Sequence, residues 1–120
     1  MSDDPAADRG DAPAVPLPGH ARGVARDHPE VWSAYQRLGQ ATGKAGPLDE
    51  RSQRLVHLAL AIGADSEGAT HSHARRALAE GMTPEEIEHV ALIAITTLGW
   101  PQAMRGLSWI HDETRKARRG

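Results

Sequence analysis

The sequence contains no cysteine, and this absence removes several kinds of chemistry at once. Without a thiol the chain can form no disulfide, no thiolate nucleophile and no thiolate metal ligand. A redox cycle that uses a pair of thiols is therefore excluded.

Aromatic residues are also scarce, at 3% of the 120 residues, and phenylalanine is absent. The core must therefore be built from Ala, Leu, Ile and Val, which suit closely packed helices. A chain of this length is expected to form one domain and to bury only a modest core as a monomer. We therefore expect it to assemble with further copies of itself.

A strong excess of either charge is lacking as well, since the formal net charge is -2. This balance gives no general attraction to nucleic acid or to an anionic membrane, so neither is expected as a partner. No segment approaches the roughly 18 consecutive apolar residues of a membrane span, and no leader pattern is recognised at the N-terminus. The expected location is the cytoplasm.

Residues 1–19 combine four aspartates with four prolines and show no apolar periodicity, so they are expected to form a disordered tail. A helical domain is expected over residues 20–114, followed by a basic, flexible end at 115–120. The first helix signal is Pro29 with Glu30 behind it. Its apolar face continues to Leu38, and the glycines from Gly39 onwards are expected to loosen and end it.

Four further helices are expected, giving an all-α fold of about five helices. Asp49 caps a helix over residues 50–62 whose second half is apolar on nearly every side, so it is expected to be buried all round. A short turn then leads to an antiparallel helix over residues 66–81. Thr83 with Glu86 forms a capping box for the next helix, and a last helix follows Gly99.

The order of signals from Gly46 to Trp109 resembles the carboxymuconolactone decarboxylase family, which includes the alkylhydroperoxidase-like proteins. The residues that carry the resemblance are Gly46-Pro47-Leu48-Asp49, His73-Ala74-Arg75-Arg76-Ala77-Leu78-Ala79-Glu80-Gly81, Thr83-Pro84-Glu85-Glu86-Ile87 and Leu98-Gly99-Trp100-Pro101. The resemblance implies a compact helical domain that assembles into dimers, trimers or hexamers. That agrees with the second apolar side of the Thr83 helix, around Leu92 and Ile93, which another subunit is expected to cover.

The resemblance also implies which activity to expect. In the alkylhydroperoxidase-like branch, two cysteines precede the shared histidine at Cys-x-x-Cys-x-x-x-His spacing, and the matching positions here are Ser66, Ala69 and His73. A glutamate of that branch's proton relay is matched by Arg54. Thiol peroxidase activity is therefore not expected. The decarboxylase branch, which acts on a carboxylated lactone without thiols or a cofactor, is more compatible with this sequence.

Two histidines are candidates for acid/base catalysis. His57 and His73 lie about eight residues on either side of the turn near Asp65, so at about 1.5 Å per residue they should sit at similar heights on antiparallel helices. His57 is also the only polar residue between Leu55 and Ile62, and an apolar setting suits acid/base work. Alternatively, each histidine only bonds a carbonyl in the core or at a subunit contact.

Two residues are candidates for substrate binding. Arg54, one turn before His57, could hold a substrate carboxylate bidentately, or it could pair with Glu50 four residues away. Trp100 could line the same pocket or simply fill the core, as could Trp109.

Glu67 and His71 also stand four residues apart and could bind a divalent metal with a third ligand. The sequence names no third ligand, and a surface pair is the alternative. His20, His28, His89 and His111 have no partner at a telling spacing and are expected at the surface.

These observations support two hypotheses. In the first, the protein is an enzyme of the decarboxylase type that needs no cofactor, with a small carboxylated lactone or a keto or hydroxy acid as substrate. His73 would act as the general acid or base with His57 assisting, and Arg54 and Trp100 would hold the substrate. In the second, it is a non-catalytic binding or scaffold protein of the same oligomeric fold.

Overall fold

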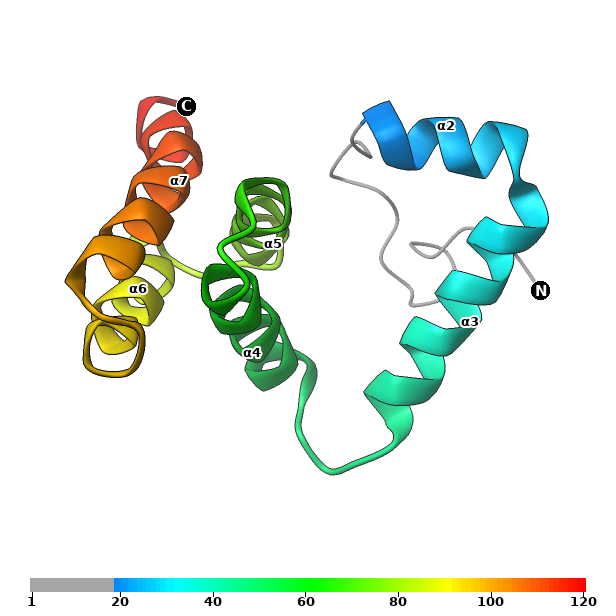
Figure 1. Cartoon of the computed structure of the whole chain (residues 1–120), viewed down its shortest axis with the longest axis horizontal. Helices are drawn as coiled ribbons and strands as arrows, with labels where there is room; N and C mark the ends of the chain where they lie inside the picture. The colour runs from blue at the N-terminus through cyan, green and yellow to red at the C-terminus, as the bar shows by residue number, and fades with distance from the viewer. Residues whose placement is uncertain (1–18) are drawn as a thin grey trace. The chain divides into compact units, whose positions relative to one another are not determined.

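A computed structural model describes residues 19–120 of the chain (Figure 1). These residues form only helices and turns, and no strand, as the sequence predicted. The helices in chain order are α2 Gly19–Asp27, α3 Pro29–Lys44, α4 Glu50–Gly63, α5 Glu67–Ala79, α6 Pro84–Leu98 and α7 Trp100–Arg119. None of them is long and apolar enough to cross a membrane.

The chain divides into two compact units after Leu48, inside the single domain expected over residues 20–114. In the described part, the first unit holds α2 and α3 and the second holds α4 to α7. The tail expected over residues 1–19 lies outside the described residues, except for Gly19, where α2 begins.

The first unit differs from the sequence expectation at both of its helices. Helix α2 was not predicted, since it is short and only Ala21, Val24 and Ala25 of its nine residues are apolar. Helix α3 continues through Gly39 and Gly43 to Lys44, so these glycines do not end it. A glycine inside a helix costs only about 1 kcal/mol relative to alanine, which a helix of this length can absorb.

Local capping sets where the helices of the second unit begin. Asp49 accepts a hydrogen bond from the Ser52 amide at 2.7 Å, which starts α4 as predicted. Ser66 does the same for the Ala69 amide at the start of α5. The predicted capping box of Thr83 and Glu86 starts α6, with both of its hydrogen bonds formed.

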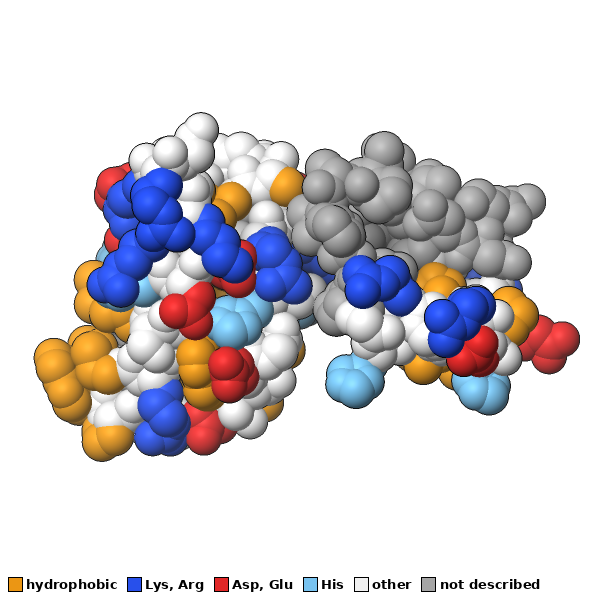
Figure 2. Space-filling view, turned by 90° about the horizontal axis from the view of Figure 1, so that it is seen from above, with side chains coloured by type: hydrophobic (Ala, Val, Ile, Leu, Met, Phe, Trp, Pro, Cys, Tyr) orange, Lys and Arg blue, Asp and Glu red, His pale blue; other side chains and the backbone are white. Residues whose placement is uncertain are grey.

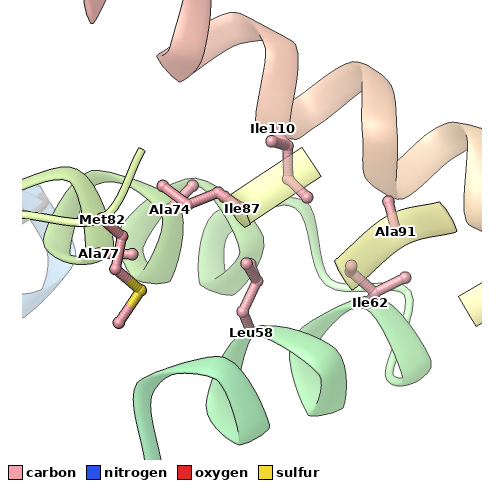
Figure 3. Close-up of a cluster of buried hydrophobic side chains, with 8 residues drawn as sticks. All are labelled: Leu58, Ile62, Ala74, Ala77, Met82, Ile87, Ala91 and Ile110. Atoms are coloured by element: carbon pink, nitrogen blue, oxygen red, sulfur yellow. The ribbon is translucent and has the colours of Figure 1, made fainter. Parts of the chain in front are cut away.

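The core of the second unit lies between these four helices. Figure 1 shows α5 beside α4 and α7 beside α6, and α5 also packs on α7 and α4 on α6. Leu58 and Ile62 point from α4 towards the helices that carry Ile87 and Ile110 (Figure 3). The core side chains are those of Leu58, Ile62, Ala74, Ala77, Met82, Ile87, Ala91 and Ile110. They are aliphatic and small, as the lack of phenylalanine required.

Helix α7 approaches α4 closely at Gly106. A Cβ atom built on Gly106 would lie 2.7 Å from Cγ2 of Ile62, nearer than non-bonded carbon atoms approach. Gln102 donates to the carbonyls of Ile62 and Gly63 at 3.0 Å each, which supplies partners to the last turn of α4. Together these contacts fix α7 against the end of α4.

The end of α7 differs from the flexible basic segment expected at residues 115–120. The helix continues to Arg119. Arg118 donates from Nη1 to Glu88 at 2.6 Å and from Nη2 to Glu85 at 3.0 Å, both on α6. Local patterns do not reveal these pairs, because the partners lie about thirty residues away in the chain.

Helix α4 is not buried all round, which corrects another expectation. Only one side of it, which includes Leu58 and Ile62, faces the core, while Val56 and Leu60 are exposed, Leu60 by 63%. On α6, Leu92 and Ile93 are exposed as well. Figure 2 shows hydrophobic side chains at the surface of one face of this unit.

Candidate functional site

The two candidate imidazoles lie next to each other, as predicted. The ring centroids of His57 and His73 are 5.1 Å apart and the ring planes are inclined by 40°. His57 comes from α4 and His73 from α5, and the two helices run in opposite directions from the turn at Asp65. Equal distances along the chain from that turn place the two rings at the same height.

The two side chains differ in exposure. His57 is exposed and His73 is half-buried. The expectation that His57 sits in an apolar wall was wrong, because its side of α4 faces away from the core. Neither ring is sealed in apolar packing, so solvent or a small molecule can approach the pair.

Arg54 joins the same cluster, although its partner is a different one from those considered in the sequence. Its Nε and Nη2 atoms donate to the two carboxylate oxygens of Glu80 at 3.0 and 2.8 Å. Among the described residues, the carboxylate that binds Arg54 through both oxygens is therefore that of Glu80 and not that of Glu50. The Arg54 side chain is only 8% exposed and that of Glu80 is 38% exposed. A buried guanidinium needs such a partner, because an unpaired buried charge is costly.

The third nitrogen of Arg54 contacts His73. Nη1 lies 2.9 Å from Nδ1 of the His73 ring. Because a guanidinium has only donors, Nδ1 must accept this hydrogen bond and carries no proton. The ring proton of His73 therefore sits on Nε2, which makes Nε2 the proton donor of the ring.

Helical periodicity explains why these side chains meet. Arg54 and His57 are three residues apart on α4, and His73 and Glu80 are seven residues apart on α5, so each pair shares one side of its helix. The start of α4 lies beside the end of α5, which brings Arg54 to Glu80. Sequence reasoning missed Glu80, although it lies about two turns beyond His73 on the predicted face.

Trp100 is not in this cluster and does not fill the core. It is the first residue of α7 and its side chain is 63% exposed. The alternative that Trp100 is a core residue was wrong, because the chain leaves the core at Gly99 before α7 begins. Trp109 is half-buried on the same helix.

The possible metal pair of Glu67 and His71 is arranged differently from the expectation. His71 Nε2 contacts Asp112 of α7 at 2.9 Å, so its partner comes from another helix. Within residues 19–120 there is no group of three or more His, Asp or Glu side chains placed to hold a metal ion. His71 thus takes part in a hydrogen-bond contact between α5 and α7.

The remaining histidines are mostly at the surface, as expected. His20, His28 and His89 are exposed. His111 departs from this expectation, since it is half-buried and its Nε2 atom lies 3.7 Å from Oε2 of Glu88. The sequence pattern could not predict that contact, because the two residues lie on different helices, α7 and α6.

The positions that match the redox cysteines have structural roles. Ser66 is the N-cap of α5, and its hydroxyl accepts the Ala69 amide hydrogen at 3.2 Å. Ala69 is half-buried in the first turn of the same helix. Neither side chain can be oxidised to a disulfide.

A surface hollow of about 330 Å³ lies on α3 and is not lined by the two imidazoles. Its lining includes Pro29, Glu30, Ser33 and Arg37. It belongs to the first unit, whereas the histidine pair belongs to the second.

Comparison with known proteins gives three findings. The sequence profile of the Carboxymuconolactone decarboxylase family matches residues 29–112. An uncharacterized protein of Methanocaldococcus jannaschii is 29% identical over 87 residues, which cover 72% of this chain and 81% of the relative. The crystal structure of a "putative carboxymuconolactone decarboxylase" from Burkholderia xenovorans LB400 is similar in fold, with a TM-score of 0.64. It is 20% identical, and the match covers 85% of this chain and 83% of that one.

Proposed function

The chain belongs to the carboxymuconolactone decarboxylase family, and from this membership we propose that it is a cytoplasmic acid/base enzyme for a small carboxylated molecule. It works without thiols or an organic cofactor. The substrate class is a lactone or a keto or hydroxy acid that carries a carboxylate, and the reaction is a lyase reaction of the decarboxylase type.

The observation that carries this proposal is the meeting of two imidazoles and a guanidinium between α4 and α5. His73 is the general acid or base, and its Nε2 proton is the one available for transfer. His57, with its ring 5.1 Å away, is the second proton-transfer group. Arg54 adds a permanent positive charge beside the rings, which favours an anionic substrate or transition state.

Arg54 cannot simply receive a substrate carboxylate in the way that the sequence suggested. Its Nε and Nη2 atoms are already bonded to Glu80. Its role in the proposal is therefore to orient His73 and to supply positive charge. A substrate carboxylate could bind Nε and Nη2 only by displacing the carboxylate of Glu80.

A screen of small lactones and of keto and hydroxy acids tests the proposal. We expect the wild type to turn over one of these compounds, and His73→Ala to lower kcat by roughly 100-fold or more with its far-ultraviolet circular dichroism unchanged. The matched control is His89→Ala, an exposed histidine on α6, which should keep wild-type turnover. Equal turnover by His73→Ala and His89→Ala would refute the role of His73.

The second candidate function is a non-catalytic scaffold built from several copies of the chain. The exposed side chains of Leu60 on α4 and Ile93 on α6, exposed by 63% and 60%, favour assembly in either case. We expect a homo-oligomer, from dimer to hexamer, in sedimentation velocity at micromolar concentration. Ile93→Glu should shift it towards monomer, and a wild-type protein that sediments as a monomer would contradict the assembly.

The activity screen separates the two candidates. An oligomer in which no compound of these classes is turned over, and in which His73→Ala melts several degrees below the wild type, supports the scaffold. That outcome would mean that His73 is a structural hydrogen-bonding group, whose loss costs about 1 to 3 kcal/mol.

A further inference from the structure

Glu80 belongs to the cluster, but none of the described hydrogen bonds joins it to a ring. It is the C-cap residue of α5 and its side chain is 38% exposed. Both of its carboxylate oxygens are used by Arg54, at 3.0 and 2.8 Å. The hydrogen-bonded path from Glu80 to His73 therefore runs through Arg54.

The geometry of a guanidinium makes that path specific. The group is planar and rigid, so two parallel hydrogen bonds to one carboxylate fix both its position and its plane. Once Nε and Nη2 are held by Glu80, the direction of Nη1 is also fixed. In this structure Nη1 points at Nδ1 of His73, at 2.9 Å.

The pairing differs in setting from another forked ion pair of this unit. Arg105 and Asp65 make the same kind of fork, at 3.0 and 3.2 Å, but their side chains are 50% and 45% exposed. Water and salt screen an exposed pair of that kind more than a buried one, so it contributes less to stability. Arg54 is nearly buried, so Glu80 holds a guanidinium that has few other positions to adopt.

We propose that Glu80 is a positioning residue of the histidine site, which acts through Arg54 to keep the ring proton of His73 on Nε2. The importance of this tautomer for catalysis rests on the proposed function, because the tautomer decides which ring nitrogen of His73 can donate a proton. The chain of contacts itself, Glu80 to Arg54 to His73, is independent of any substrate.

The tautomer of His73 can be measured directly in the full-length protein. Long-range ¹H–¹⁵N spectra of protein labelled with ¹⁵N-histidine separate a protonated ring nitrogen from an unprotonated one, and His73→Ala identifies the signals of His73. They are recorded at a pH where the ring is neutral. We expect an unprotonated Nδ1 and a protonated Nε2 in the wild type.

Glu80→Gln keeps the size of the side chain and removes its charge. We expect the two nitrogen signals of His73 to move towards each other as the second tautomer becomes populated. The matched control is Glu50→Gln, which removes the same charge one turn before Arg54 on α4, at a residue that makes no side-chain bond to Arg54 in the described chain. That control should leave the His73 signals where they are in the wild type.

Two further variants test the path through Arg54. Arg54→Lys keeps the charge and removes the fork, so it should shift the His73 signals as Glu80→Gln does. Adding Glu80→Gln to Arg54→Lys should change them little further, because the two residues act as one unit. Glu80→Asp, which keeps the carboxylate, should return the signals part of the way to the wild type. If Glu80→Gln does not fold, the comparison of Arg54→Lys with Glu80→Asp carries the test.

The proposal is overturned if a folded Glu80→Gln protein has the wild-type His73 spectrum, or if Glu50→Gln shifts it equally. It is also overturned if Nδ1 is protonated in the wild type. Failure of the proposed function looks different. In that case the tautomer depends on Glu80 as described, while His73→Ala does not affect the turnover of any compound in the screen.

Discussion

His57 and His73 lie eight residues on either side of Asp65, and their ring centroids are 5.1 Å apart. The turn between α4 and α5 therefore acts as the centre of an approximate symmetry along the chain. This relation holds for the two imidazoles, whereas Arg54 and Glu80 lie at unequal distances from the turn and meet through the reach of their long side chains. Asp65 itself has a φ of 54°, in the left-handed region, and its carboxylate bonds Arg105 of α7. The turn that pairs the imidazoles is thus held by a third helix.

A first prediction concerns redox chemistry. The purified protein should show no peroxide turnover that depends on added thiol, because Ser66 and Ala69 cannot form the thiolates that such a reaction needs. The measurement is peroxide consumption with and without a dithiol reductant, beside a heat-killed sample. Consumption above that sample would show a reactive group that the sequence does not reveal.

A second prediction concerns the contact between α7 and α4. Gly106→Ala should lower the free energy of unfolding by about 1 to 3 kcal/mol, because the added methyl group would lie 2.7 Å from Cγ2 of the fully buried Ile62. Gly68→Ala is the matched control, since nothing lies within 4 Å of its Cβ position. That change should be neutral or stabilising by about 0.5 to 1 kcal/mol. Urea denaturation of both variants gives the comparison, and equal stabilities would contradict the close approach.

A third prediction concerns pH and the end of α7. Hydrogen bonds from Arg118 and Thr114, together with the charge of Arg118, hold the pKa of Glu88 below its ordinary value of 4.5. A carboxylate with a lowered pKa in the folded state stabilises the protein above its unfolded pKa, and this stability is lost as the pH falls through the folded pKa. The contribution of Arg118 should therefore be largest near neutral pH, should begin to fall as the pH approaches the ordinary pKa of a glutamate, and should disappear once the pH is below the lowered pKa of Glu88.

Arg118→Gln tests this when its unfolding free energy is compared with that of the wild type from pH 7 down to the acid limit. The difference should shrink as the pH falls. Arg115→Gln, an exposed arginine one turn earlier on α7, serves as the control and should show a much smaller difference. A difference for Arg118→Gln that stays constant with pH would mean that Glu88 is not its partner.

The sequence predicted the helices of the second unit well because their signals are local. Asp49, Ser66 and Thr83 each cap a helix within three residues of themselves. Helix α2 carried no such capping signal. Gly39 and Gly43 suggested that α3 would end early, but the helix continues through both of them. The end of α7 at Arg119 could not be predicted in this way, because the residues that hold it lie far away in the chain.

The site was predicted in part for the same reason. The pairing of His57 with His73 follows from counting residues around one short turn. The pairing of Arg54 with Glu80 depends on how far two long side chains reach across the helix interface, which periodicity does not give. The exposure of His57 and Leu60 depends on which side of α4 the other helices cover, and an evenly apolar sequence does not specify that side.

The most direct test of the account is a double-mutant comparison of His57 and His73 in turnover. His73→Ala should lower kcat by roughly 100-fold or more, His57→Ala by less, and the double variant should be about as slow as His73→Ala alone, because the two imidazoles serve one site. Losses that multiply in the double variant would show that the two histidines act independently. That result would contradict the claim that they form a single acid/base site.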